Sequence, residues 1–251
     1  MQRIFHTPEG VRDIYSQECS RKQKLQEKLH RVFHQYGFED IETPTFEYFE
    51  VFSKEVGTIP SRELYKFFDR EGNTLVLRPD FTPSVSRACA TYFNPEKEVV
   101  SLCYTGNTFI NNSSFRGRLK ETTQMGVERM GDDSPEADAE ILAMTVECLL
   151  ATGLTEFQVS VGQVDYYKAI FAQTGLSQEE EEELRELISQ KNYFGVEELV
   201  KNKNMDKSLA RVLSQLPQMF GSTEVLEKAK SLTDNPQALK AVARLEEIYE
   251  L

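Results

Sequence analysis

The segment Thr105–Gly131, which reads TGNTFINNSSFRGRLKETTQMGVERMG, constrains the fold most strongly. Its two halves flank Asn111–Gly117, and this arrangement predicts a long antiparallel hairpin. Side chains alternate between the two faces of a strand, so Gln124, Gly126 and Glu128 are expected on one face. A buried carboxylate without a partner is costly, so Glu128 is expected to be hydrated or occupied by a ligand.

Local signals predict a mixed α+β organisation for residues 1–162. The apolar spacing predicts an amphipathic helix over residues 16–36, and a short strand is expected at Glu39–Thr43. Thr82 is expected to be the N-cap of a helix with Pro83 at its first position. A hairpin is expected with its turn at Asp69–Asn73. A buried strand is expected at Val99–Tyr104, a helix from Ser134-Pro135, and a final strand at Phe157–Val161.

Residues 163–251 carry helical signals only, and we expect a separate all-helical domain there. Ser177 and Glu180 have the spacing of a capping box, and Asn235-Pro236 is expected to begin a last helix. The apolar pattern of that helix continues to Leu251. We therefore expect these residues to be part of a longer protein, interrupted before the rest of the first domain.

Composition excludes several classes of function. The net charge of −12 argues against a protein whose main partner is nucleic acid, because phosphate binding needs basic patches. The four cysteines are widely spaced, which indicates reduced thiols and no cysteine-pair zinc site. His30 and His34 stand at i and i+4, a spacing that can bind metal, but the pattern offers no third ligand. No metal and no cofactor are expected, and without a signal peptide or an apolar span the chain is expected to be cytoplasmic.

Four segments together resemble the N-terminal catalytic core of histidyl-tRNA synthetase, in the same order and with similar spacing. They are TPEGVRD, YGFEDIETPTFE, LRPDFTPSVSR and the hairpin, at Thr7–Asp13, Tyr36–Glu47, Leu77–Arg87 and Thr105–Gly131. The resemblance implies a class II aminoacyl-tRNA synthetase-like antiparallel sheet flanked by helices, with residues 163–251 as a helical insertion. It also implies dimerisation through Tyr36–Glu47.

The sequence departs from the synthetases where ATP would bind. Arginines of the family pattern fall on Ile110 and Ser113, and neither side chain can replace a guanidinium toward polyphosphate. The third segment has Asp-Phe-Thr at residues 80–82, where synthetases usually have Glu-Gly-Thr. This form is similar to the paralogue family that regulates ATP phosphoribosyltransferase.

The family residues that bind histidine correspond to Asp80, Thr82, Gln124 and Glu128. A carboxylate and a hydroxyl suit an α-ammonium group, and a second carboxylate suits an imidazole N–H. The alternative is structural: a turn residue at Asp80, a helix cap at Thr82, and strand-lining positions at Gln124 and Glu128. Arg78 is expected to be a structural ion-pair partner, for Asp80 or Glu128.

Three cations remain near the tip of the hairpin, at Arg116, Arg118 and Lys120. They are candidates for binding a phosphate or carboxylate group. The alternative is a solvated cationic loop.

The resemblance implies a non-catalytic regulatory subunit with L-histidine as effector. Its partner would be the short catalytic subunit of ATP phosphoribosyltransferase, in the first step of histidine biosynthesis. A homodimer within a hetero-oligomer is expected, with no tRNA and no membrane. Two alternatives stay open: a divergent histidyl-tRNA synthetase, and a paralogue with no role for histidine.

Overall fold

The computed structural model describes residues 5–53, 59–112, 117–203 and 205–251. The chain forms two compact units. The first comprises Met1–Asp133 with Ile141–Phe157, and the second comprises Ser134–Glu140 with Gln158–Leu251. The sequence-based division between residues 162 and 163 stays a prediction. Among the described helices, none combines the length and apolar character that a membrane span requires.

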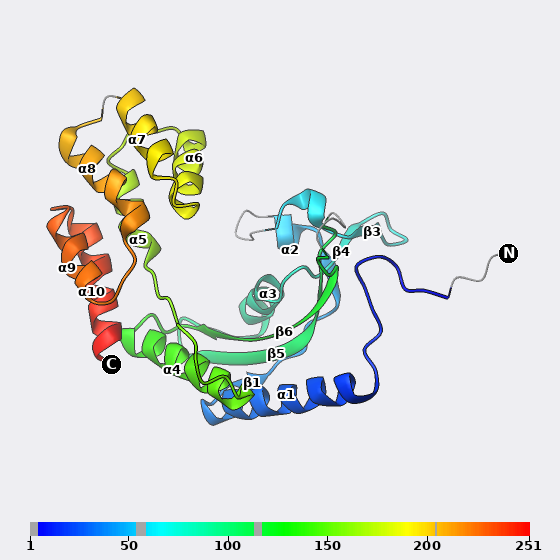
Figure 1. Cartoon of the computed structure of the whole chain (residues 1–251). Helices are drawn as coiled ribbons and strands as arrows, with labels where there is room; N and C mark the ends of the chain where they lie inside the picture. The colour runs from blue at the N-terminus through cyan, green and yellow to red at the C-terminus, as the bar shows by residue number, and fades with distance from the viewer. Residues whose placement is uncertain (1–4, 54–58, 113–116, 204) are drawn as a thin grey trace. The chain divides into compact units, whose positions relative to one another are not determined.

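The main sheet of the first unit is built on the hairpin. Its strands are β1 (Glu39–Asp40), β5 (Val100–Phe109) and β6 (Glu121–Met130), in the order β1-β5-β6 (Figure 1). β5 and β6 are antiparallel from Val100 opposite Met130 to Phe109 opposite Glu121, so the predicted hairpin is confirmed. β1 is parallel to β5, which makes this sheet mixed.

Helices cover both faces of the main sheet (Figure 1). α3 (Thr82–Tyr92) covers one face, and its apolar core consists of Phe81, Val85, Cys89, Val100, Leu102 and Tyr104. On the other face lie α1 (Ser16–Gln35) and the later turns of α4 (Pro135–Thr152), around a core of Val32, Phe33, Phe38, Cys103 and Met144. Alternation along β5 explains this division, since Leu102 and Tyr104 point to α3 while Cys103 points to α1.

A second, antiparallel sheet has the strand order β2-β4-β3. Its strands are β2 (Phe46–Tyr48), β3 (Lys66–Phe68) and β4 (Thr74–Leu77). As predicted, β3 and β4 form a hairpin, and the Asp69 carboxylate accepts a hydrogen bond from the Asn73 N–H at 2.8 Å in its turn. The short helix α2 (Glu50–Ser53) and a 3-10 turn, η1 (Ser61–Glu63), lie between β2 and β3.

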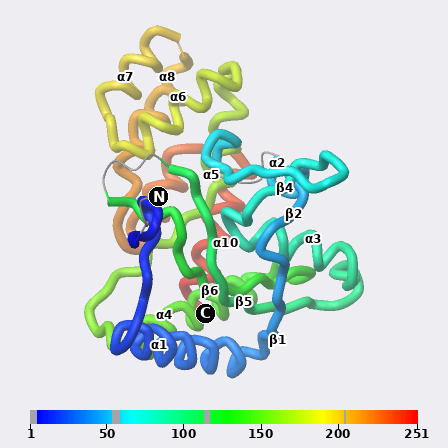
Figure 2. The backbone as a smooth tube through the Cα atoms, turned by 90° about the vertical axis from the view of Figure 1, so that its right-hand side faces the viewer, coloured from blue at the N-terminus to red at the C-terminus, as the bar shows by residue number. Residues whose placement is uncertain are grey.

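Helices are the only regular elements among the described residues of the second unit. Its elements are α5 (Val164–Phe171), α6 (Gln178–Ser189), α7 (Tyr193–Asn202), α8 (Lys207–Gln215), η2 (Leu216–Gln218), α9 (Glu224–Ser231) and α10 (Pro236–Glu250). α6, α7 and α8 lie together, as Figure 2 shows. The predicted capping box is confirmed, with Ser177 and Glu180 bonded reciprocally. Asn235 caps α10 as expected, accepting from the Gln237 and Ala238 N–H groups.

Two local predictions were wrong, and a third was wrong only in the length of the element. Thr82 is not the N-cap of α3: Phe81 holds that position, and the Thr82 hydroxyl donates to Glu128 instead. Phe157–Val161 forms no strand, because no described strand pairs with it, and Val161 is 50% exposed. A strand needs a neighbour for its backbone hydrogen bonds, which an apolar pattern alone does not supply. The strand expected at Glu39–Thr43 is shorter and ends at Asp40.

Candidate functional site

The four residues expected to bind histidine lie in one cluster on the α3 face of the sheet. β6 contributes Gln124 and Glu128, the loop before α3 contributes Asp80, and the first turn of α3 contributes Thr82. The Thr82 hydroxyl donates to Glu128 Oε1 at 2.6 Å. The Gln124 amide donates to Asp80 Oδ1 at 3.1 Å. The polar groups are therefore paired with one another across three elements.

Tyr104 completes this cluster and was not predicted. Its hydroxyl lies 3.4 Å from Glu128 Oε1, and its ring stacks on Phe81 with centroids 4.3 Å apart. Tyr104 lies opposite Gly126 in the hairpin register. A Cβ at Gly126 would come within 2.6 Å of Tyr104 Cζ, so only glycine lets the ring lie across the strand. The sequence did offer a signal for Tyr104: Gly126, between Gln124 and Glu128, leaves room for a large side chain on the facing strand.

The cluster is acidic and has no internal cation. Burial raises the pKa of Glu128, and the negative charge of Asp80 raises it further. Burial also raises the pKa of Tyr104, which therefore stays a hydrogen-bond donor at neutral pH. Within the described part of the chain, no lysine or arginine forms an ion pair with Glu128. Such a site favours a ligand that brings positive charge and N–H donors.

Arg78 does not pair with Asp80 or Glu128, so that prediction was wrong. Its guanidinium donates to the carbonyl oxygens of Asn107 and Thr43, each at 2.8 Å, and lies 4.0 Å from the centroid of the Phe81 ring. These carbonyls belong to the end of β5 and the link between β1 and β2. Arg78 therefore joins two segments of main chain that no strand pairing connects.

The cationic tip is only partly described, because Ser113 and Arg116 lie outside the described residues. Arg118 is exposed and Lys120 is half-buried. The backbone N–H of Lys120 donates to Gly10 O at 2.7 Å, and its carbonyl accepts from the Ile110 N–H at 2.9 Å. The main chain of Lys120 thus anchors the N-terminal segment. The anion site and the solvated loop both stay predictions.

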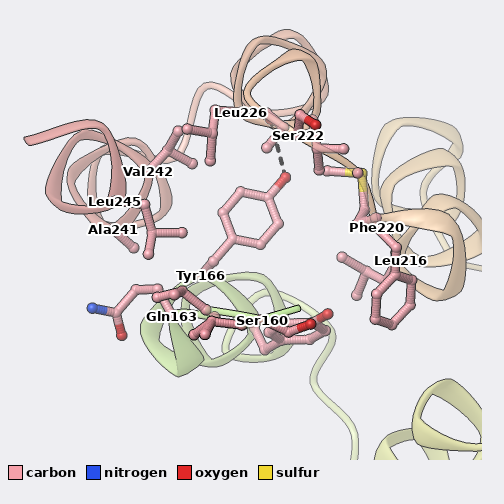
Figure 3. A pocket seen from close by; sticks show the side chains of 18 of the residues that line it. Ser160, Gln163, Tyr166, Leu216, Phe220, Ser222, Leu226, Ala241, Val242 and Leu245 are labelled. Carbon is pink, nitrogen blue, oxygen red and sulfur yellow. Dashed lines mark hydrogen bonds between the residues drawn. The ribbon is translucent and has the colours of Figure 1, made fainter. Parts of the chain in front are cut away.

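The second unit has a separate cavity of about 390 Å³, shown in Figure 3. Tyr166 lies at its centre, and its hydroxyl donates to Ala229 O at 3.0 Å. Leu216, Phe220 and Val242 are among the apolar side chains around it. None of the described residues that line this cavity carries a charge. It therefore lacks groups to hold the ammonium and carboxylate of an amino acid, which the Glu128 cluster has in part.

Comparisons with curated proteins point to one group of relatives. The chain is 40% identical over 247 residues to a protein from Acetivibrio thermocellus named ATP phosphoribosyltransferase regulatory subunit. A protein of the same name from Ruminiclostridium cellulolyticum is 38% identical. Each alignment covers 98% of this chain but 59% of the relative. The chain thus spans about three fifths of the length of these curated relatives.

Solved structures bear out the expected fold. A protein from Bacillus halodurans, described as an ATP phosphoribosyltransferase regulatory subunit/histidyl-tRNA synthetase, superposes with a TM-score of 0.88 at 31% identity. The match covers 100% of this chain and 65% of that one. A histidyl-tRNA synthetase from a Nostoc species, 19% identical with a TM-score of 0.77, supports the fold alone and covers 99% and 58% of the two chains. The class II synthetase-like α+β fold is confirmed.

The family comparison covers nearly the whole chain. The family model described as histidyl-tRNA synthetase matches residues 10–251, which include both the sheet with its polar cluster and the helical unit. The chain belongs to the histidyl-tRNA synthetase family.

Proposed function

We propose that this chain is the histidine-sensing part of a regulatory subunit of ATP phosphoribosyltransferase. The observation that carries the proposal is Glu128, a half-buried carboxylate with a raised pKa and no cationic partner among the described residues. A ligand with an ammonium and an imidazole supplies the missing charge and donors. The names of the relatives at 40% and 38% identity support the same function.

The arrangement of the ligand follows from the roles that the family resemblance assigns. Asp80 and Thr82 receive the α-ammonium group, and Gln124 bridges ammonium and carboxylate. Glu128 accepts an imidazole N–H. Without ligand these groups bond to each other, Thr82 to Glu128 and Gln124 to Asp80. Histidine therefore replaces hydrogen bonds from neutral donors with bonds in which a cationic ammonium group donates to a carboxylate.

The same proposal includes the loss of synthetase activity. Ile110 stands where the family has an arginine, and its backbone N–H is used in the hairpin with Lys120 O at 2.9 Å. An aliphatic side chain offers no donor to a triphosphate, and each lost hydrogen bond to a charged group costs about 1.5–3 kcal/mol. ATP binding and amino-acid activation are therefore weakened by orders of magnitude.

The proposed partner is the short catalytic subunit of ATP phosphoribosyltransferase. Histidine changes the activity of that partner only if it binds more tightly to one state of the assembly than to another. Self-association through Tyr36–Glu47 belongs to this proposal, as a homodimer inside a hetero-oligomer. No tRNA takes part, and the complex is cytoplasmic.

Calorimetry on the full-length protein tests the proposal. L-histidine and ATP are titrated separately into the same preparation. Saturable heat from histidine and none from ATP is the expected result. If histidine gives no heat of binding, both with and without the catalytic subunit, the proposal that this protein senses histidine is wrong.

One competing function has a specific observation in its favour. The matching family model is described as histidyl-tRNA synthetase, and one similar structure carries both names. A divergent synthetase would bind ATP and charge tRNA with histidine. An aminoacylation assay separates the two: activity above the protein-free background supports the enzyme and contradicts the regulatory proposal.

A further inference from the structure

A second cluster of chemically active side chains lies on the opposite, α1 face of the main sheet. His30 Nε2 is 2.5 Å from Asp40 Oδ1, and His34 Nε2 is 3.0 Å from Asp40 Oδ2. Cys103 Sγ is 3.4 Å from Asp40 Oδ1. One potential ligand atom from each of the four residues lies within 4.8 Å of all the others. The proposed histidine site uses none of them.

Regular structure brings the four residues together. His30 and His34 are one turn apart on α1, with ring centroids 4.1 Å apart. Asp40 and Cys103 are direct partners in the parallel pairing of β1 with β5, and the Ile41 N–H donates to Cys103 O at 2.9 Å. Partners in a sheet point to the same face, so both side chains face α1. The third and fourth groups, which the His pair lacks in the sequence, come from pairing between distant segments.

We propose that His30, His34, Asp40 and Cys103 form a binding site for a divalent transition metal of the zinc class. Two imidazoles, a carboxylate and a thiolate are the ligand types that zinc takes in four-coordinate sites. Bonds of about 2.0–2.3 Å in a tetrahedron place ligand atoms about 3.3–3.6 Å apart. The present separations from the Asp40 oxygens are 2.5, 3.0 and 3.4 Å, and no two of the four ligand atoms are more than 4.8 Å apart, so each pair is within about 1.5 Å of that spacing.

Metal binding here replaces hydrogen bonds with bonds to the ion. The two Nε2 atoms and the Cys103 sulfur each lie within hydrogen-bond distance of the Asp40 carboxylate. Zn²⁺ forms bonds to both Nε2 atoms, one carboxylate oxygen and the sulfur. Each neutral imidazole keeps its one N–H on Nδ1, and the Cys103 thiol proton leaves to solvent. No electron is transferred and no co-reactant is needed. Burial and the Asp40 charge raise the pKa of Cys103 to about 12, so the ion must supply the stabilisation that the thiolate lacks.

The position of the site indicates its role. Four protein ligands leave no open position, which is typical of structural and not catalytic zinc. The ion would join the C-terminal half of α1 to the β1–β5 edge, beside the core formed by Val32, Phe33 and Cys103. Access is available from solvent, because the side chains of His30 and His34 are 39% and 46% exposed.

Titration of Zn²⁺ and Co²⁺ into the full-length, metal-free protein under reducing conditions tests the site. We expect one saturable equivalent, an increase in melting temperature, and a Co²⁺ spectrum with tetrahedral d–d bands and a thiolate charge-transfer band. His30→Ala and His34→Ala should each weaken metal binding by at least about 10- to 100-fold. Substituting a residue that only hydrogen-bonds to a metal ligand already causes a loss of that size, and these variants remove a ligand itself. His6→Ala is the matched control, because His6 is an exposed histidine outside the cluster.

Cys103→Ser tests the fourth ligand separately. It should remove the charge-transfer band and keep the d–d bands; an unchanged spectrum overturns the four-ligand site. Absence of saturable binding in the wild-type protein overturns the whole proposal, as does equal binding by His30→Ala, His34→Ala and His6→Ala. Because His34 is exposed and His30 is partly exposed, their variants are expected to fold, and circular dichroism checks this for each preparation.

Discussion

Glu128 and Asp40 are carboxylates on the same sheet, on opposite faces, and their pKa values shift in opposite directions. Glu128 lies on the α3 face, where burial raises its pKa and Asp80 adds to the effect. Asp40 lies on the α1 face, where a hydrogen bond from His30 holds its pKa below the ordinary value. Both carboxylates have hydrogen-bond partners, so hydrogen bonding alone does not explain the difference. Burial is the largest cause of the raised pKa of Glu128, whereas the hydrogen bond from His30 is the largest cause of the lowered pKa of Asp40.

The comparison explains why we propose a different ligand for each face. No cation pairs with Glu128 among the described residues, so for the Glu128 cluster we propose an organic ligand that carries an ammonium group. The Asp40 cluster already has imidazole partners, so a ligand must displace protons and offer stronger bonds than they do. A metal ion meets that requirement and an amino acid does not. The two clusters are therefore expected to respond independently to substitution.

The largest expected effect is the loss of histidine affinity on the α3 face. Glu128→Gln should weaken binding about 10- to 100-fold, because a hydrogen bond to a charged group is worth about 1.5–3 kcal/mol. Asp40→Asn should leave histidine affinity unchanged. Calorimetric titration of L-histidine measures both. Glu121→Gln is the matched control, since Glu121 is on β6 but bonds to Asn107 outside the cluster. Wild-type affinity in Glu128→Gln would remove Glu128 from the site.

Gly126→Ala should destabilise the protein, because the added methyl group collides with Tyr104 on the α3 face of the sheet. The added Cβ would come within 2.6 Å of Tyr104 Cζ, and overpacking of this kind costs about 1–3 kcal/mol of unfolding free energy. Urea denaturation measures the loss. Gly162→Ala is the control, because a Cβ there meets nothing within 4 Å. Equal stability of the two variants would show that Tyr104 can leave the cluster without cost.

Tyr104→Phe should have a smaller effect on the same face. The distance of 3.4 Å to Glu128 Oε1 is long for a hydroxyl donor, so the loss is expected near the lower end of about 0.5–1.5 kcal/mol. The ring keeps its stacking on Phe81. The same urea experiment measures it. If Tyr104→Phe lost as much unfolding free energy as Gly126→Ala, the effect of Gly126→Ala could not be assigned to displacement of the Tyr104 ring.

The smallest expected effect is in the dependence of stability on pH. The folded pKa of Glu128 is raised, so the folded state holds this proton longer than the unfolded state does. Stability of the wild type therefore falls as pH rises from the ordinary value of 4.5 through the raised pKa, and Glu128→Gln abolishes this decline. Asp40 has the opposite sign: its contribution is present above 3.8 and is lost as pH falls through its lowered pKa.

Urea midpoints for the wild type, Glu128→Gln and Asp40→Asn, measured from acidic to neutral pH, test these signs. Relative to the wild type, Glu128→Gln should gain stability toward neutral pH, while Asp40→Asn should lose it. Matching slopes for the two variants would contradict the comparison between the faces.

Local patterns were enough to predict the hairpin and the helical unit. Alternation along β6 placed Gln124 and Glu128 on one face, because the period of a strand is fixed by its backbone. The capping box of Ser177 and Glu180 was readable because both residues act within one turn. The resemblance to a family, not the local pattern, supplied Asp80 and Thr82 as members of the cluster.

What could not be predicted depends on contacts between distant segments. Tyr104 reaches Glu128 only because the hairpin register sets it opposite Gly126. Asp40 and Cys103 are 63 residues apart in sequence and meet through a two-residue parallel strand. The prediction of Thr82 as an N-cap was wrong for a similar reason. The Thr82 hydroxyl donates to Glu128, which lies on β6, 46 residues further along the chain.

Inhibition of the reconstituted enzyme tests the central claim most directly. The full-length protein is combined with the short catalytic subunit of ATP phosphoribosyltransferase, and activity is followed as L-histidine is added. Our account predicts that the wild-type assembly is active and inhibited by histidine. The Glu128→Gln assembly should be equally active but need about 10- to 100-fold more histidine for the same inhibition. Equal inhibition of both assemblies would contradict the assignment of histidine sensing to the Glu128 cluster.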